Sequence, residues 1–255
     1  MMDRPRYDND IIPEDIPLDI VYEDEDLMVI NKPAGLVVHP GCGNYHGTLV
    51  NAIAWHLKDN PKYDPNDPQV GLVHRIDKDT SGLLVVAKTP DAKTHLGLQF
   101  YNKTTKRKYN ALVWGIVEND EGTVEGNIGR NPKDRMQMAV LSDPTQGKHA
   151  VTHYRVLERL GYVTLVECVL ETGRTHQIRV QFAHAGWPLL GDTKYGNTTV
   201  AGTAGSPAYR GVALCAYSLD FTHPGNGKKM SFRVKPQNPA FEKFTKIPSE
   251  DIFEG

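Results

Sequence analysis

Apolar residues in the first part of the chain gather in short runs, at positions 20–22, 27–30, 36–38 and 83–87. Polar turn residues, such as those from Lys32 to Gly35, separate these runs, so the pattern predicts strands joined by tight connections. Gly71 to His74 is predicted as a further short strand. The run at 83–87 is apolar at every position, which indicates a central strand covered on both faces.

Three other stretches have apolar residues at helical spacing. Thr48 can cap a helix whose apolar face holds positions 49, 52, 53 and 57, and Asp91 can begin a second helix that reaches Phe100. A third helix is predicted within 174–186, and further strands at 109–117, 150–157, 162–170, 213–221 and 229–234. Because strands and helices do not alternate regularly, the pattern disfavours a doubly wound parallel sheet. It predicts an α+β fold with a mixed, mainly antiparallel sheet and packed helices.

The acidic charge is concentrated at one end of the chain. Residues 1–26 hold ten acidic side chains against two basic ones, a local net charge of −8. Because the whole chain has a net charge of −2, the other 229 residues together carry +6. A basic surplus of this size is compatible with phosphate binding, and solvated surface charge explains it equally well. Residues 1–17 are also rich in proline and have no apolar period, so we expect a flexible N-terminal segment followed by one domain over 18–255.

Composition narrows the class of protein further. No apolar run approaches the roughly 18 residues that span a bilayer, and the N-terminus is acidic where a secretory signal would be basic, so a cytoplasmic location without a membrane partner is expected. The three cysteines have unrelated spacings and are interpreted as reduced thiols. Neither a P-loop nor a dinucleotide-binding glycine pattern is present, which gives no support to a nucleotide cofactor.

The segment GLVHRIDKDTSGLLVVAKT, at 71–89, places charged residues between two apolar runs. A loop held at both ends by buried strands can position polar groups well, although an ordinary solvated loop has the same composition. A metal site is the weaker interpretation, because no pair among the candidate histidines has the spacing of a helical zinc site and Arg75 and Lys78 would repel a cation. The candidate ligands considered for it are His39, His46, His74, Asp77, Asp79 and His184.

Carboxylate catalysis is the third interpretation of this segment. Asp77 lies between Arg75 and Lys78, two positively charged side chains that can contact an anionic ligand. An arginine from elsewhere in the fold would give this carboxylate a fixed partner, and Arg174 and Arg179, both within GRTHQIRVQ, are the candidates. The alternative for these two arginines is the solvated face of a helix.

The HRIDKDTSGLLVVAKT segment resembles the HRxD signature of the RluA/RluD family of pseudouridine synthases. The resemblance continues through PLDIVYEDEDLMVINKPAGLVVHPG, GTLVNAI, KRKYNALVWG, KHAVTHYRVLE, LETGRTHQIRV and PLLGDTKYG, which lie in the family's order and cover most of the chain. It implies a catalytic domain with a mixed, bent sheet that isomerises uridine to pseudouridine in RNA, with no cofactor and no required metal. Large-subunit ribosomal RNA is the first substrate it implies, and transfer RNA the second.

The resemblance also implies roles for individual residues. Asp77 matches the catalytic aspartate, Tyr109 the tyrosine that packs on the target base, and Arg179 the basic residue that pairs with the aspartate. Arg75 matches the arginine that can enter the RNA helix as the uridine leaves it. Further RNA contacts are expected from His74, Arg174, Lys106, Arg107 and Lys108, together with Lys103 in the same basic cluster.

Alternatives remain open on the sequence alone. A non-catalytic RNA-binding or ribosome-assembly factor on the same fold is one, although binding does not require Asp77, Tyr109 and Arg179 together. A carboxylate-dependent nucleoside glycosidase is another. The sequence departs from the family at Gln181, where relatives often have histidine, and after Gly196. Only about 17 residues precede Leu18 where many relatives have an S4-type domain, so either the S4 domain is lacking or the chain is part of a longer protein; a monomer is expected.

Overall fold

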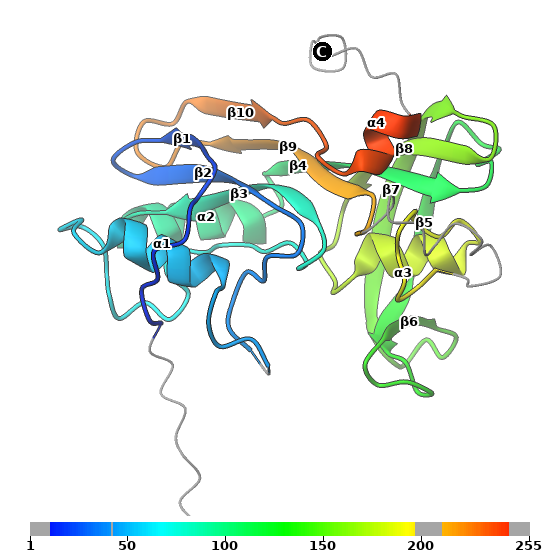
Figure 1. Cartoon of the computed structure of the whole chain (residues 1–255), viewed down its shortest axis with the longest axis horizontal. Coiled ribbons are helices and arrows are strands. Elements are labelled where there is room, and N and C mark those ends of the chain that lie inside the picture. The colour runs from blue at the N-terminus through cyan, green and yellow to red at the C-terminus, as the bar shows by residue number, and fades with distance from the viewer. Residues whose placement is uncertain (1–10, 42, 197–210, 245–255) are drawn as a thin grey trace, which may run out of the picture.

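One sheet of ten strands runs through the described part of the chain, residues 11–41, 43–196 and 211–244, in the computed structural model (Figure 1). The strands are β1 (Ile20–Glu23), β2 (Leu27–Lys32), β3 (Ser81–Ala87), β4 (Lys106–Trp114), β5 (Glu121–Arg130), β6 (Met138–Leu141), β7 (Lys148–Arg159), β8 (Val163–Leu170), β9 (Leu214–Thr222) and β10 (Lys229–Arg233). Their order is β1-β2-β3-β9-β4-β8-β7-β5-β6, with β10 also beside β9. Only β3 and β9 pair in parallel, which confirms the mixed, mainly antiparallel sheet.

Two helices cover the first half of the sheet, α1 (Leu49–Leu57) and α2 (Pro90–Tyr101). Met28 and Ile30 of β2 pack in one core with the apolar residues of α1, whereas Leu27 and Val29 pack in a second core with those of α2. Because neighbouring strand residues point to opposite faces, the two helices lie on opposite sides of the sheet. This double cover explains why β2 and β3 are buried at every position.

The second half of the sheet is covered by α3 (Gln177–His184) and α4 (Pro239–Phe244), which lie on opposite sides of it in Figure 1. Phe182 of α3 belongs to the same core as α1, and Phe241 of α4 packs with Leu112 and Leu165 in a third core. The loop that precedes β3 and the start of α3 therefore meet on one face of the sheet. Among the described residues, no helix is long and apolar enough to cross a bilayer.

Most elements predicted from the sequence are present, and the exceptions have local reasons. The predicted strand at 36–38 is wrong, because the carbonyls of Val37 and Val38 accept hydrogen bonds from the first amides of α1. The one at 71–74 is also wrong and is reduced to a single bridge from Leu72 to Val86. The strand that begins before Tyr109 ends at Trp114 instead of 117, since Gly115 adopts φ +91°. The sequence missed β5, β6 and α4.

The N-terminal segment is attached to α1 over its described part. The amide of Glu14 donates to the Asn51 carbonyl at 3.0 Å, the Asn51 side chain donates to the Ile12 carbonyl at 2.9 Å, and Ile11 packs on the core. Two backbone polar groups of residues 11–17, the Glu14 amide and the Ile12 carbonyl, therefore have partners on the helix. Residues 1–10 lie outside the described part of the chain.

Lys32 at the end of β2 is fully buried, with 0% of its surface exposed. Its ammonium donates to the carbonyls of Pro33 and Leu36 at 2.8 Å and of Lys78 at 2.9 Å. Burial lowers the pKa of Lys32 from its ordinary 10.5 to about 8, against the attraction of Asp79 and Asp77. One ammonium thus fastens the 33–36 turn to the loop that carries Asp77.

Replacing Lys32 with methionine should destabilise the fold by about 2 kcal/mol, because three carbonyls lose a charged donor. Between pH 8 and 10.5 the unfolded chain binds more protons at this residue than the folded chain does, so the wild type gains stability as pH rises. The difference in unfolding free energy between wild type and Lys32→Met should therefore widen over this window in urea titrations. A difference that stays constant or narrows would contradict the buried, charged lysine.

Candidate active site

Asp77 lies in the loop between Leu72 and β3, and backbone contacts fix this loop at several points. The Thr80 amide donates to the Asp77 carbonyl at 3.1 Å, and the Lys78 carbonyl accepts from the Gly35 amide at 2.8 Å as well as from Lys32. At the start of β3, Gly82 has φ +122°, and a Cβ there would lie 2.3 Å from the Ala216 carbonyl oxygen. The loop is therefore held between the 33–36 turn and β9, which restrains Asp77.

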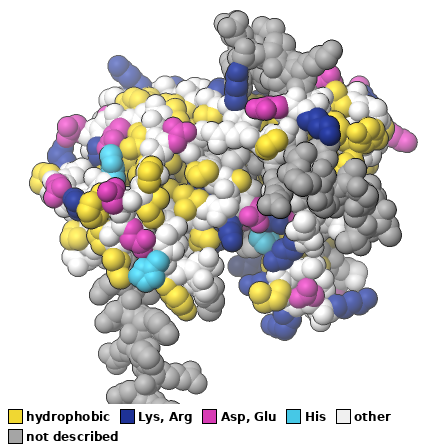
Figure 2. Space-filling view, viewed as in Figure 1, with side chains coloured by type: hydrophobic (Ala, Val, Ile, Leu, Met, Phe, Trp, Pro, Cys, Tyr) yellow, Lys and Arg dark blue, Asp and Glu magenta, His cyan; other side chains and the backbone are white. Residues whose placement is uncertain are grey.

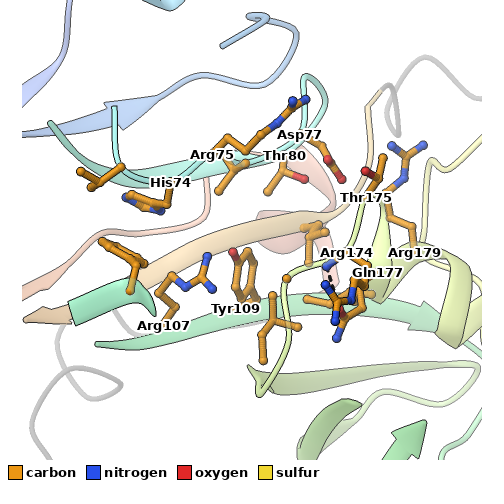
Figure 3. A pocket seen from close by; sticks show the side chains of 17 residues that line it. His74, Arg75, Asp77, Thr80, Arg107, Tyr109, Arg174, Thr175, Gln177 and Arg179 are labelled. Carbon is orange, nitrogen blue, oxygen red and sulfur yellow. Dashed lines mark hydrogen bonds between the residues drawn. The ribbon is translucent and has the colours of Figure 1, made fainter. Parts of the chain in front are cut away.

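A pocket of about 320 Å³ opens between this loop, β4 and the start of α3 (Figure 3). Asp77, Tyr109 and Arg179, which lie far apart in the sequence, all line it, and the Asp77 side chain points to the side of Thr175 and Arg179. Pockets of this size admit a nucleoside-sized ligand. The other lining residues are Val73, His74, Arg75, Ile76, Thr80, Phe100, Arg107, Leu170, Gly173, Arg174, Thr175, Gln177, Ile178 and Leu214.

Tyr109 forms the floor of the pocket together with Arg107, because alternate residues of β4 face the same side of the sheet. Burial raises the pKa of Tyr109, and although nearby Arg107 lowers it, the phenol stays protonated. Its ring is therefore neutral and its hydroxyl is available as a donor. Lys106 and Lys108 point to the opposite face, where the Lys108 ammonium lies 3.4 Å from Glu167, so the structure does not bring these two lysines to the pocket.

His74 is fixed in its neutral form at the side of the pocket. Its Nε2 accepts the Val85 amide at 3.0 Å, so the neutral ring carries its hydrogen on Nδ1, which is buried without a partner among the described residues. Burial, with a further contribution from Arg107, lowers the pKa of His74 well below its usual value. The ring also stacks on Phe100 at 4.3 Å, and the Arg107 guanidinium lies 5.4 Å from the Phe100 ring.

Arg179 is paired with Asp192 and not with Asp77, which corrects the pairing expected from the sequence. Its Nε donates to Asp192 Oδ2 at 2.8 Å and its Nη2 to Oδ1 at 2.9 Å, with side chains only 4% and 1% exposed. No ion pair within 4.0 Å joins Asp77 to any basic residue in the described part of the chain. Burial opposes the charge of Arg179, but Asp192 and, at longer range, Asp77 raise its pKa. Arg179 thus supplies a fixed positive charge near Asp77.

Two glutamines hold the start of α3 against the sheet: Gln177, which the sequence pattern did not single out, and Gln181, which it marked only as a departure from the family. Gln177 donates to the Val151 carbonyl at 3.0 Å and accepts the Arg174 amide at 2.9 Å. Gln181 donates to the Ala150 carbonyl at 3.0 Å and does not line the pocket, so its departure from the family pattern lies outside the site. Their spacing of four residues on one face of the predicted helix was the available signal.

The remaining predicted residues lie at the rim of the pocket or outside it. Arg174 lines the pocket and its Nε donates to the His149 carbonyl at 2.9 Å. Arg75 is exposed, and in Figure 3 its side chain extends away from Tyr109 toward the outside of the loop. Lys103 lies in the turn before β4, outside the pocket lining.

The residues considered as metal ligands in the sequence do not form a group in the structure. Among the described residues, the grouping with suitable atoms is Asp24, Asp26 and His223. There the His223 Nε2 lies 2.7 Å from Asp24 Oδ2, and its Nδ1 accepts the amides of Gly225 and Asn226. Both ring nitrogens are therefore used in hydrogen bonds. The two described cysteines, Cys168 and Cys215, are free and buried.

Fold and site together define an enzyme with a carboxylate in a nucleoside-sized pocket, bordered by arginines on a mixed sheet. Residues 26–184 match the family model described as RNA pseudouridylate synthase. The chain is 49% identical over 225 residues to an uncharacterized RNA pseudouridine synthase YlyB of Bacillus subtilis, covering 88% of this chain and 71% of that protein. It is 48% identical over 229 residues to the ribosomal large subunit pseudouridine synthase D of Zymomonas mobilis, covering 89% and 72%.

A solved structure agrees with these matches. The human RNA pseudouridylate synthase domain containing 1 superposes with a TM-score of 0.67 at 27% identity, covering 86% of this chain and 83% of that one. The chain therefore belongs to the RNA pseudouridine synthase family, as its motifs indicated. It is an RNA-modifying isomerase.

Proposed function

We propose that this protein converts specific uridines of large-subunit ribosomal RNA to pseudouridine, with Asp77 as the catalytic carboxylate. The observation that carries the proposal is the convergence of Asp77, Tyr109 and Arg179 on one pocket. Binding RNA alone would require neither a restrained carboxylate nor a buried tyrosine beside it, so this arrangement disfavours a purely RNA-binding factor. A carboxylate can attack carbon or assist departure of the base and then leave again.

The reaction rearranges one nucleotide without loss of atoms. The bond between ribose C1′ and base N1 breaks, a bond between C1′ and C5 forms, the hydrogen of C5 is released to solvent and N1 gains a hydrogen. Asp77 acts on the reacting carbon, and the positive charge of Arg179 stabilises the negative charge on this side of the pocket. Tyr109 supplies a neutral ring against the base.

A uridine in a stacked RNA helix cannot enter this pocket, so the substrate nucleotide has to be flipped out at a cost of a few kcal/mol. Stacking on the Tyr109 ring recovers part of this cost. Arg107 in the pocket floor and Arg174 and Arg75 at the rim are expected to contact the flanking phosphates.

The RNA is expected to extend beyond the pocket along the face shown in Figure 2. Lys and Arg side chains gather there at the lower right, over the region where Figure 1 places β6. Arg130, Lys133 and Arg135 are the exposed bases at the end of β5 and in the connection to β6. A basic face of this kind attracts the RNA backbone.

The substrate assignment rests on the names of relatives, several of which are ribosomal large subunit pseudouridine synthases D at 47–50% identity. Transfer RNA is the second candidate. RNA labelled with tritium at C5 of uridine tests both, since isomerisation releases tritium to water. The purified protein should release it from ribosomal RNA without producing free uracil on chromatography, whereas a glycosidase would produce uracil. No release from ribosomal, transfer or total RNA would overturn the proposed activity.

Arg107 and Lys106 are neighbours on β4 that face opposite sides, which makes them a matched pair. Arg107→Gln should weaken RNA binding and lower the slope of log affinity against log salt by about one, as for one lost phosphate contact. Lys106→Gln should change the slope much less, because this side chain lies away from the pocket. Salt titrations of both variants by filter binding decide the question. Equal changes would place the RNA backbone on both faces of β4.

A further inference from the structure

Tyr195, just after the pocket helix α3 in the chain, connects three parts of the molecule through one side chain. Its hydroxyl accepts the Met138 amide of β6 at 3.1 Å and lies 2.6 Å from His176 Nδ1. Its ring lies under the Arg179 guanidinium at 5.1 Å, and its amide donates to Asp192 at 3.1 Å. The side chain therefore contacts the β5–β6 hairpin, the start of α3 and the buried ion pair.

The hydrogen bonds at this hydroxyl fix the state of the His176 ring. Burial raises the pKa of Tyr195, so the hydroxyl keeps its hydrogen. The Met138 amide donates a hydrogen bond to the hydroxyl oxygen. The hydroxyl hydrogen in turn is within reach of His176 Nδ1, which accepts it. In this arrangement the neutral His176 ring carries its hydrogen on Nε2.

His176 is held in a conformation that only surrounding contacts can maintain. It is the N-cap residue of α3 with φ +56°, a left-handed conformation that is rare for residues other than glycine, and its side chain does not cap the helix. It lies between Thr175 and Gln177, both of which line the pocket. The ring itself is not part of the pocket lining and lies within hydrogen-bond distance of the Tyr195 hydroxyl.

Burial is the largest influence on the protonation of His176, and the neighbouring charges act on it in both directions. Asp77 and Asp192 favour its protonated form, whereas burial, Arg179 and Lys194 favour the neutral form, and its pKa is lowered on balance. A protonated His176 would attract the Asp77 carboxylate and compete with the reacting nucleotide for it. Only the neutral His176 ring can accept a hydrogen bond at Nδ1 from the Tyr195 hydroxyl. This hydrogen bond therefore stabilises the neutral ring and lowers the pKa of His176 further.

We propose that Tyr195 is a positioning residue for the reaction. Anchored by the Met138 amide, its hydroxyl holds His176 neutral beside Asp77, and its ring supports Arg179. The role rests on the proposed function of this site. It also makes the geometry of β6, on the side of the molecule where exposed bases lie, a determinant of the state of the active site. RNA that fixes the hairpin would thereby favour the competent arrangement.

Two variants remove the connection from its two ends. Tyr195→Phe deletes only the hydroxyl. Met138→Pro deletes the amide donor together with the methionine side chain, at the first residue of an edge strand where proline is tolerated. Met138→Ala keeps the amide, and Tyr162→Phe removes the hydroxyl of a tyrosine that is 61% exposed and stacks on Trp114 outside the pocket. These two are the controls.

For Tyr195→Phe, kcat for tritium release should fall by about 10-fold at the acid end of the pH range, with KM nearly unchanged, and should recover as pH rises. The recovery is expected because His176 protonates at higher pH once the hydroxyl is lost, and only its protonated form sequesters Asp77. Met138→Pro should shift the acid limb of the pH–kcat profile in the same direction. The double variant should lose no more kcat than Tyr195→Phe alone. Loss that is equal at all pH values, or full activity of Met138→Pro, would overturn the proposal.

NMR titration of the histidine rings separates this proposal from the proposed function, because it requires no activity. The His176 signal, assigned with His176→Gln, should titrate at higher pH in Tyr195→Phe than in the wild type. An unchanged titration would overturn the connection even if the enzyme is active. An inactive wild type with the expected titration shift would instead overturn the proposed function and leave the hydrogen-bonded connection in place.

Discussion

Asp77→Asn is expected to reduce tritium release by about a thousandfold or more, which corresponds to a loss of about 4 kcal/mol of transition-state stabilisation. The amide has the size of the carboxylate but is a poor nucleophile and carries no charge. The backbone of the loop should persist, because the Thr80 amide bonds to the residue 77 carbonyl and Lys32 bonds to the residue 78 carbonyl. Single-turnover kinetics with saturating enzyme measure the loss directly.

Asp79 provides the matched control two residues further along the same loop. It is also a half-buried carboxylate, but it does not line the pocket. Asp79→Asn should keep turnover within a few-fold of the wild type, and both variants should bind RNA with nearly wild-type affinity. If Asp77→Asn retained a tenth of the activity, or Asp79→Asn lost as much, Asp77 would not be the catalytic carboxylate.

The charged loop at 71–80 shows how far sequence reasoning reaches in this protein. Its apolar flanks identified a restrained loop, and the family motif singled out Asp77, which the structure places in the pocket. The origin of the restraint was not visible in the sequence. It depends on the Lys32 ammonium and on the close approach of Gly82 to β9, both of which are contacts between distant segments.

The elements that the sequence missed share a physical cause. Strand β5 reads EGTVEGNIGR, with three glycines and mostly half-buried or exposed side chains, so it has little apolar period. Pairing with β7 along its length holds it in place. Strand β6 has only four residues. Local pattern can indicate strands that bury a face, as for β3, but not strands that exist because a neighbour supplies hydrogen bonds.

The basic cluster before Tyr109 illustrates the same limit at the site. The sequence grouped Lys106, Arg107 and Lys108 as one set of phosphate contacts, yet the alternation of a strand sends Arg107 to the pocket and the two lysines to the other face. The pairing of Arg179 was also beyond reach, because Asp192 follows it at a spacing that no helix or strand rule connects. Both outcomes became apparent only from the fold.

Asp192→Ala is expected to destabilise the protein by about 3–5 kcal/mol, since it leaves the buried Arg179 guanidinium without its partner. Arg179→Ala should be similarly unstable, because it leaves a buried carboxylate unpaired. Urea-induced unfolding followed by circular dichroism measures both effects.

The double variant Arg179→Met with Asp192→Leu separates stability from catalysis. Replacing both members of a buried ion pair by apolar side chains of similar size is often neutral for stability, so most of the unfolding free energy should return. Turnover should not return, because Asp77 would face the nucleotide without the positive charge that Arg179 places near it. A stable double variant with near wild-type tritium release would show that Arg179 serves the fold alone, whereas stability without turnover would assign it to the reaction.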